Sequence, residues 1–192
     1  MNKTQIFLIV LFSNFIFINA CTKDKTETQP STQPLAIGVD YQGGKVAYIL
    51  QPGDPGYISG QVHGLIASPS DQSTGIRWHN TTYIIIGDTS TALGAGMANT
   101  NAIVNSQGAG SYAAKLCYDL VLGGYSDWYL PSKNELNKLY LNKAVIGGFS
   151  IFNYWSSSES DVNNAKYQIF SNGNQLKYDK NIPLYVRAVR SF

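Results

Sequence analysis

The chain has 192 residues, of which only 14% are charged and 12% are aromatic, with 13 tyrosines among them. A typical chain has about 25% charged residues, so neutral amide, hydroxyl and phenol groups carry most of the polarity here. The formal net charge is +2. Nucleic-acid-binding domains are usually much more basic than this. We therefore expect no nucleic-acid partner.

The first 20 residues have the layout of a secretory signal peptide. Lys3 precedes an apolar run over Ile6–Ile18, and the small residue Ala20 comes just before Cys21. The run is shorter than the about 20 apolar residues of a membrane-spanning helix, whereas its length and flanks suit a cleaved signal. We predict that residues 1–20 are removed.

The cleavage point resembles a bacterial lipobox, since Ile18-Asn19-Ala20 ends at Cys21. This resemblance implies lipidation of Cys21, attachment to a membrane through that lipid, and a place in the bacterial cell envelope at the outer membrane. The alternative is a plain secretory signal that ends near a cysteine. Residues 21–34 contain no large apolar side chain, and such a segment cannot fold by burial, so we predict a flexible tether there.

Residues 35–192 have the length of one compact domain. In its first half, alternation and turn residues predict strands over 43–50 and 63–67, a brief extended segment over 76–78, and a helix over 97–105. Tyr83–Ile86 is interpreted as a buried strand or an ordered loop. Cys117 lies among apolar residues at helical spacing and is expected to be a small core residue.

The second half changes from helices to strands. Ser111 is expected to cap a helix that stops at Gly123-Gly124, and Ser132 with Glu135 forms a capping box that opens another helix to about residue 142. Strands are predicted over 154–157, 165–170, 175–178 and 184–190, with a hairpin turn at Asn172-Gly173. The fold class is therefore α+β. In the last strand, Arg187 or Arg190 is expected to pair with Glu159 or Glu135.

Three segments together resemble the Lcl C-terminal domain family, which is named for a collagen-like bacterial surface adhesin. They are Trp128-Tyr129-Leu130-Pro131-Ser132, Trp155-Ser156-Ser157-Ser158-Glu159 and Val186-Arg187-Ala188-Val189-Arg190. The resemblance covers nearly all of residues 38–192. It implies a C-type-lectin-like fold, with two to three helices packed on a small, mostly antiparallel sheet. More distant relatives are the formylglycine-generating sulfatase-modifying enzymes.

The superfamily contains binders and enzymes, so the side chains must decide between them. The formylglycine-generating enzymes use a cysteine pair, but no cysteine lies between Trp155 and Arg190, and Cys117 has no partner. His63 and His79 are not at metal-ligand spacing. We predict a non-enzymatic binding or adhesion module with no catalytic residue. A metal-dependent enzyme of the formylglycine-generating branch and an envelope protein that binds another protein remain as alternatives.

A glycan or matrix polysaccharide is the ligand that the family resemblance implies. The candidate ligand-binding residues lie together in a polar, turn-rich region: Trp78, His79, Asn80 and Tyr83. Aromatic faces stack on sugar rings, and amides and hydroxyls orient them. The alternative is a half-buried tryptophan that covers a loop. The sulfated polymers that the family's adhesin prefers would need a basic face, which this composition does not offer.

An oxygen-rich segment after the Trp155 strand is a weak candidate for calcium. Its residues are Glu159, Asp161, Asn163 and Asn164. Calcium takes six to eight oxygen ligands, and with only two carboxylates an ordinary polar turn is the favoured interpretation. The Glu-Pro-Asn and Trp-Asn-Asp signatures of calcium-dependent lectins are absent. We therefore expect no cofactor, with calcium as the one possible exception.

Overall fold

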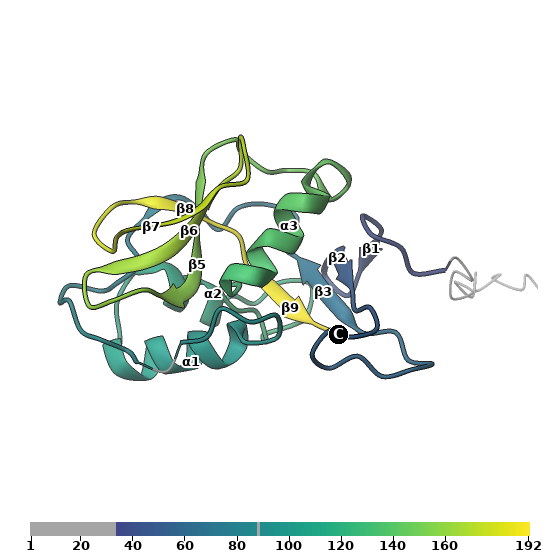
Figure 1. Cartoon of the computed structure of the whole chain (residues 1–192), viewed down its shortest axis with the longest axis horizontal. Coiled ribbons are helices and arrows are strands. Elements are labelled where there is room, and N and C mark those ends of the chain that lie inside the picture. The colour runs from purple at the N-terminus through teal and green to yellow at the C-terminus, as the bar shows by residue number, and fades with distance from the viewer. Residues whose placement is uncertain (1–33, 88) are drawn as a thin grey trace, which may run out of the picture. The chain divides into compact units, whose positions relative to one another are not determined.

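The computed structural model describes residues 34–87 and 89–192, which form two sheets with three helices packed against them (Figure 1). The predicted α+β class and mostly antiparallel pairing are confirmed. The predicted signal peptide, Cys21 and nearly all of the tether lie outside the described residues. None of the helices in the described ranges is long and apolar enough to cross a membrane.

The first sheet is antiparallel and joins the beginning and the end of the domain. It consists of β1 (Asp40–Tyr41), β2 (Gly44–Ile49), β3 (Gly64–Ala67) and β9 (Val189–Ser191), in the order β1-β2-β3-β9. Successive side chains of a strand point to opposite faces. Leu65 and Ala67 therefore join one apolar core cluster, whereas Ile66 joins the other. This alternation leaves β3 buried on both faces.

The second sheet has the order β4-β8-β5-β6-β7, and its β5–β8 pair is parallel. The strands are β4 (Ser73–Ile76), β5 (Asn153–Glu159), β6 (Asn164–Ile169), β7 (Gln175–Asp179) and β8 (Leu184–Val186). The predicted hairpin turn between β6 and β7 is confirmed. Gly173 takes a positive φ of 84° there, and the Asn174 N–H donates to the Asn172 side chain at 3.0 Å.

The predicted strand over 184–190 is two strands in different sheets, because the chain crosses from β8 to β9 at Arg187-Ala188. This crossing directs the two arginines to separate loops. Arg187 pairs with Asp71 at 2.7 Å, and Arg190 pairs with Asp127 at 2.7 Å. The expected partners, Glu159 and Glu135, were therefore wrong.

Two of the helices lie at the positions that the sequence predicts. α1 spans Gly96–Gln107 and α3 spans Lys133–Ile146. The capping box of α3 is confirmed: Ser132 Oγ accepts from the Glu135 N–H at 3.3 Å, and Glu135 Oε2 accepts from the Ser132 N–H at 2.7 Å. α3 packs against strands of both sheets, while α1 packs against β5 and α2 (Figure 1).

The remaining helix, α2, spans only Ala113–Tyr118, and Ser111 does not cap it. The Gly123-Gly124 pair is a tight turn rather than a helix end. Both glycines have positive φ angles, 63° and 83°, and Leu122 and Tyr125 exchange backbone hydrogen bonds of 3.0 and 3.1 Å. Two positive φ angles at the centre are what a two-residue hairpin turn requires. Cys117 is fully buried in the core, as predicted, and burial raises the pKa of its thiol.

Candidate functional site

A pocket of about 330 Å³ lies between the loop after β4 and the C-terminal end of α1. We call it the polar pocket. It is lined by Asn80, Thr81, Thr82, Ile84, Ser106 and Gln107. Apart from Ile84, these residues carry neutral amide or hydroxyl groups, and no charged side chain lines the pocket. Such a lining can exchange hydrogen bonds with an uncharged ligand.

Asn80 fixes one side of the polar pocket to the end of α1. Its backbone N–H donates to Gln107 Oε1 at 2.5 Å, and its side-chain amide donates to the carbonyls of Gln107 and Ala109 at 3.3 and 2.8 Å. A Cβ at Gly110 would lie 2.2 Å from Asn80 Oδ1, so this close approach needs glycine. The Asn80 amide is therefore used for structure, although the residue lines the pocket.

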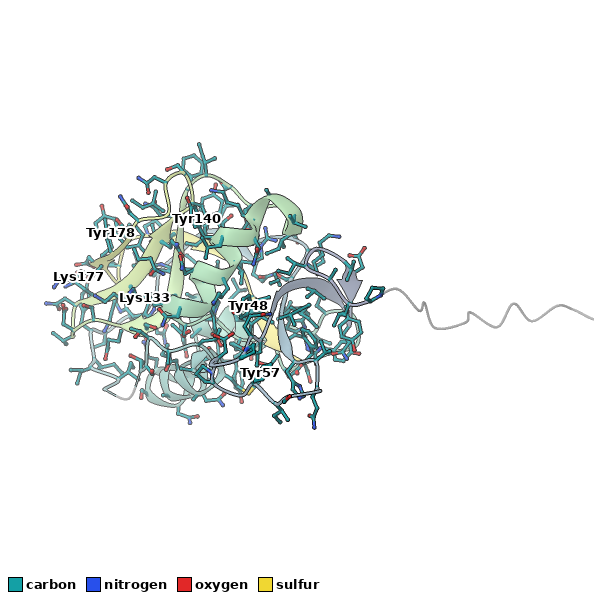
Figure 2. All side chains as sticks on the ribbon, turned by 45° about the vertical axis from the view of Figure 1, so that its right-hand side comes forward. Tyr48, Tyr57, Lys133, Tyr140, Lys177 and Tyr178 are labelled. Carbon is teal, nitrogen blue, oxygen red and sulfur yellow. The ribbon has the colours of Figure 1, made fainter. Side chains whose placement is uncertain are left out.

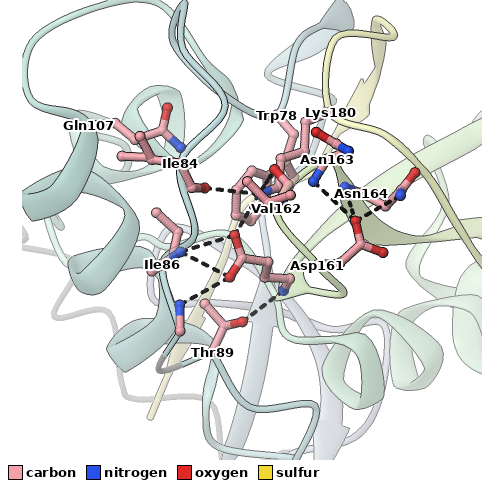
Figure 3. A network of polar contacts seen from close by, with 12 residues as sticks. Trp78, Ile84, Ile86, Thr89, Gln107, Asp161, Val162, Asn163, Asn164 and Lys180 are labelled. Carbon is pink, nitrogen blue, oxygen red and sulfur yellow. Dashed lines mark hydrogen bonds and ion pairs between the residues drawn. The ribbon is translucent and has the colours of Figure 1, made fainter.

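The other side of the pocket is held by a buried ion pair, shown in Figure 3. Lys180 Nζ lies 2.5 Å from Glu159 Oε1, and the two side chains are only 0% and 6% exposed. The Glu159 carboxylate also accepts from the backbone N–H groups of Ile86 and Gly87 at 3.0 to 3.1 Å. Lys180 Nζ donates to the Ile84 carbonyl at 3.2 Å. These bonds hold residues 84–87 as an ordered loop, not a strand.

Trp78 lies in the core and has no exposed surface. Its indole N–H donates to the Ser156 carbonyl at 2.8 Å, and Lys180 Nζ lies 4.8 Å from the ring centroid. The ring is therefore not available to stack on a sugar, which corrects its assignment as a ligand-binding residue. The half-buried alternative was also wrong. In the sequence, Trp78 stands at the start of a polar segment, and this position gave no indication that its ring packs into the core.

His79 is also buried, at 2% exposure, and its ring stacks on Tyr83 with centroids 4.5 Å apart. Neither ring nitrogen has a hydrogen-bond partner among the described residues. Burial lowers the pKa of His79, and the nearby Thr82 backbone only partly opposes this effect. His79 is therefore a neutral support beneath Tyr83 and does not face a ligand.

Tyr83 is the one predicted aromatic residue that reaches the surface, with 38% exposure. Its hydroxyl donates to Asp179 Oδ1 at 2.6 Å, and one face packs on His79. Tyr83 stands between the pocket residues Thr82 and Ile84 in the chain but does not itself line the polar pocket. A rigid, half-exposed ring is suited to stacking on a sugar.

The four candidate calcium residues do not form one cluster of free oxygens. The Glu159 carboxylate is occupied by Lys180 and two backbone N–H groups. Asp161 Oδ1 accepts from the backbone N–H groups of Asn163 and Asn164 and from the Asn164 amide, while its Oδ2 lies 3.1 Å from Lys177 Nζ. These contacts together lower the pKa of Asp161 to about 2, and the hydrogen bond from the Asn164 amide has the largest effect. Within residues 34–87 and 89–192, no group of three His, Cys, Asp or Glu side chains is placed to hold a metal.

The sequence prediction missed the residues of the pocket that come from α1. Ser106 and Gln107 follow Asn80 by more than twenty residues, and no periodicity links them to it. Thr81 and Thr82 lie between the predicted residues Asn80 and Tyr83, and this adjacency was the only local indication that they line the pocket. Of the four predicted residues, Asn80 lines the polar pocket and Tyr83 is exposed, whereas Trp78 and His79 are buried; the pocket lining also includes two threonines and the end of α1.

The Lcl C-terminal domain family matches residues 69–190. The chain belongs to this family. The match contains all three segments on which the resemblance was based and the whole polar pocket, and it begins after the first three strands. Membership in the Lcl C-terminal domain family fits a module of a bacterial surface protein. No curated protein matches the chain.

Among solved structures, the fold is similar to that of a fimbrial protein from Bacteroides ovatus, with a TM-score of 0.50 and 14% sequence identity. The superposition covers 82% of this chain and 45% of the fimbrial protein. The chain therefore spans less than half the length of that protein, and the likeness shows the fold alone.

Proposed function

We propose that the domain is a non-catalytic binding module of the bacterial surface that recognises an uncharged, hydroxyl-rich glycan in the polar pocket without calcium. One observation carries this proposal. The side-chain hydroxyls of Thr81, Thr82 and Ser106 are exposed and make no hydrogen bond to any described residue. Three free hydroxyls beside a fixed tyrosine offer both donors and acceptors to a sugar.

The arrangement of charges favours an uncharged ligand over a sulfated one. No basic side chain lines the polar pocket, and Lys180, which lies behind its loop, is neutralised by Glu159. An anion in this pocket would lose water without gaining a charged partner, which is unfavourable. Tyrosine content by itself does not locate a binding site in this domain. The domain carries tyrosines at many separate places, for example Tyr48, Tyr57, Tyr140 and Tyr178 (Figure 2).

The test of the proposal removes hydroxyls while keeping the shape of the pocket. In the full chain held in detergent, Thr82→Val combined with Ser106→Ala should weaken binding of the best neutral glycan by about tenfold, because each lost hydrogen bond contributes about 0.5–1.5 kcal/mol. Titration calorimetry measures the change. Thr74→Val, at an exposed threonine on β4, is the matched control.

Unchanged binding by the double variant would contradict the proposal. Turnover of a glycan by the wild-type chain that a single substitution abolishes would also contradict it, and would favour an enzyme instead.

We also propose that a lipid on Cys21 attaches the module to the outer membrane. Several acyl chains hold a protein at a bilayer, whereas a single chain binds only marginally. In membrane fractionation, Cys21→Ala should move the protein from the membrane pellet to the soluble fraction. A variant that still sediments with membranes would overturn the anchor and leave the glycan proposal intact.

A further inference from the structure

A second pocket, of about 270 Å³, lies between α1, the end of α2 and the chain that follows the Gly123-Gly124 turn. We call it the α2 pocket. Its floor is formed by buried residues that include Trp128 and Tyr129. Its rim consists of Met97, Asn101, Tyr118, Ser126 and Asp127.

The rim of the α2 pocket combines an exposed aromatic ring with neutral polar groups. Tyr118 is 47% exposed. The side chains of Asn101 and Ser126 are exposed and make no hydrogen bond within the described part of the chain. Asp127 is held by Arg190 through bonds of 2.7 and 2.8 Å and remains 42% exposed. The hydrogen bond from Arg190 lowers the pKa of Asp127, so the rim holds an ionised carboxylate, paired with Arg190, that can accept hydrogen bonds from ligand hydroxyls.

The two pockets lie on different sides of the same helix and close together. Asn101 and Ser106 are five residues apart on α1, which corresponds to about 7.5 Å along the axis and about 140° around it. Between them the outer face of α1 carries exposed Ala98 and Asn105. A ligand chain can therefore pass over small and amide side chains from one pocket to the other.

The helix that separates the pockets has no charged residue, and neither has the whole segment from Thr89 to Ala114. The outer face of a surface helix normally carries charged side chains. Their absence here extends the uncharged lining of the polar pocket across α1 to the α2 pocket.

We propose that the two pockets are subsites of one extended site, which crosses α1 and binds a chain of uncharged sugars. This inference rests on the proposed function and specifies its ligand as a polysaccharide rather than a single sugar. Once one subsite is filled, the second contact becomes intramolecular, so longer chains bind more tightly without any stronger individual contact.

The experiment compares chain lengths and variants. The full chain in detergent is titrated with uncharged gluco-, manno- and galacto-oligosaccharides, from monosaccharides to octasaccharides, by biolayer interferometry. For the preferred series, affinity should rise at least about tenfold with length. Tyr118→Ala and Asn101→Ala should each lower the affinity for the longest chains about fivefold, which removes most of this rise. Tyr178→Ala is the matched control, since Tyr178 is 44% exposed on β7 (Figure 2).

Three results would overturn the inference. Affinity that does not depend on length, or a length dependence that Tyr118→Ala and Asn101→Ala leave intact, would show that the α2 pocket is not a subsite. If the Thr82→Val and Ser106→Ala changes still weaken binding after either of these results, the proposed glycan binding in the polar pocket is supported without the extended site. No binding to any series would overturn both proposals.

Discussion

At the scale of single residues, the buried charges determine where the surface site can form. The side chains of Glu159 and Lys180 are buried. They form hydrogen bonds with the backbone of the loop from Ile84 to Gly87. A charge that is buried and then loses its partner is strongly destabilising. The order of this loop, and with it the polar pocket, therefore depends on one ion pair.

Lys180→Met is expected to lower the free energy of unfolding by about 3–5 kcal/mol, because it leaves the Glu159 carboxylate buried without its cation. Chemical denaturation measures this loss. Lys177→Met is the control, since Lys177 pairs with Asp161 at the surface, where the two side chains are 57% and 37% exposed. A surface pair contributes about 0–1 kcal/mol, so equal losses in the two variants would contradict the account.

His79 gives the fold a dependence on pH whose sign follows from burial. Its pKa in the folded state lies below the ordinary value of 6.5, so the unfolded chain takes up this proton first. Stability should therefore fall as the pH drops from about 7.5 to about 5.5. His79→Phe should reduce this fall when urea midpoints are compared at both pH values. An unchanged pH dependence in His79→Phe would show that folding does not lower the pKa of His79.

At the scale of elements, the two serines that were expected to cap helices offer a matched pair. Ser132 caps α3 and also donates to the Ala92 carbonyl at 2.7 Å, whereas Ser111 makes no capping bond to α2. Ser132→Ala should lower the thermal midpoint by an amount equivalent to about 0.5–2 kcal/mol, while Ser111→Ala should leave it unchanged. Similar effects in both variants would contradict the cap assignment.

The same pair shows what local sequence can predict about elements. The α3 cap was predictable because Ser132 and Glu135 satisfy each other within one turn. The end of α2 was not, because Gly123-Gly124 suits a helix end and a hairpin turn equally well. The alternation over 184–190 was also correct as a pattern, but it did not reveal that the chain changes sheets at Arg187. Which sheet a strand joins depends on contacts far away in the sequence.

At the scale of the whole molecule, the candidate site depends on tertiary contacts more than on any motif. The fold class and the family were predictable, since the Trp128–Ser132, Trp155–Glu159 and Val186–Arg190 segments are continuous in the chain. The site was only partly predictable. Of the predicted residues, Asn80 lines the polar pocket and Tyr83 is exposed, but Trp78 and His79 are buried, and the packing of α1 adds Ser106 and Gln107 to the lining.

The proposed recognition of an uncharged glycan without calcium can be measured directly on a glycan array. The full chain in detergent would be applied once with calcium and once with a chelator, to uncharged glycans and their sulfated counterparts. We expect binding to uncharged glycans at equal strength in both conditions. Binding that is lost in chelator, or that is confined to the sulfated forms, would contradict it.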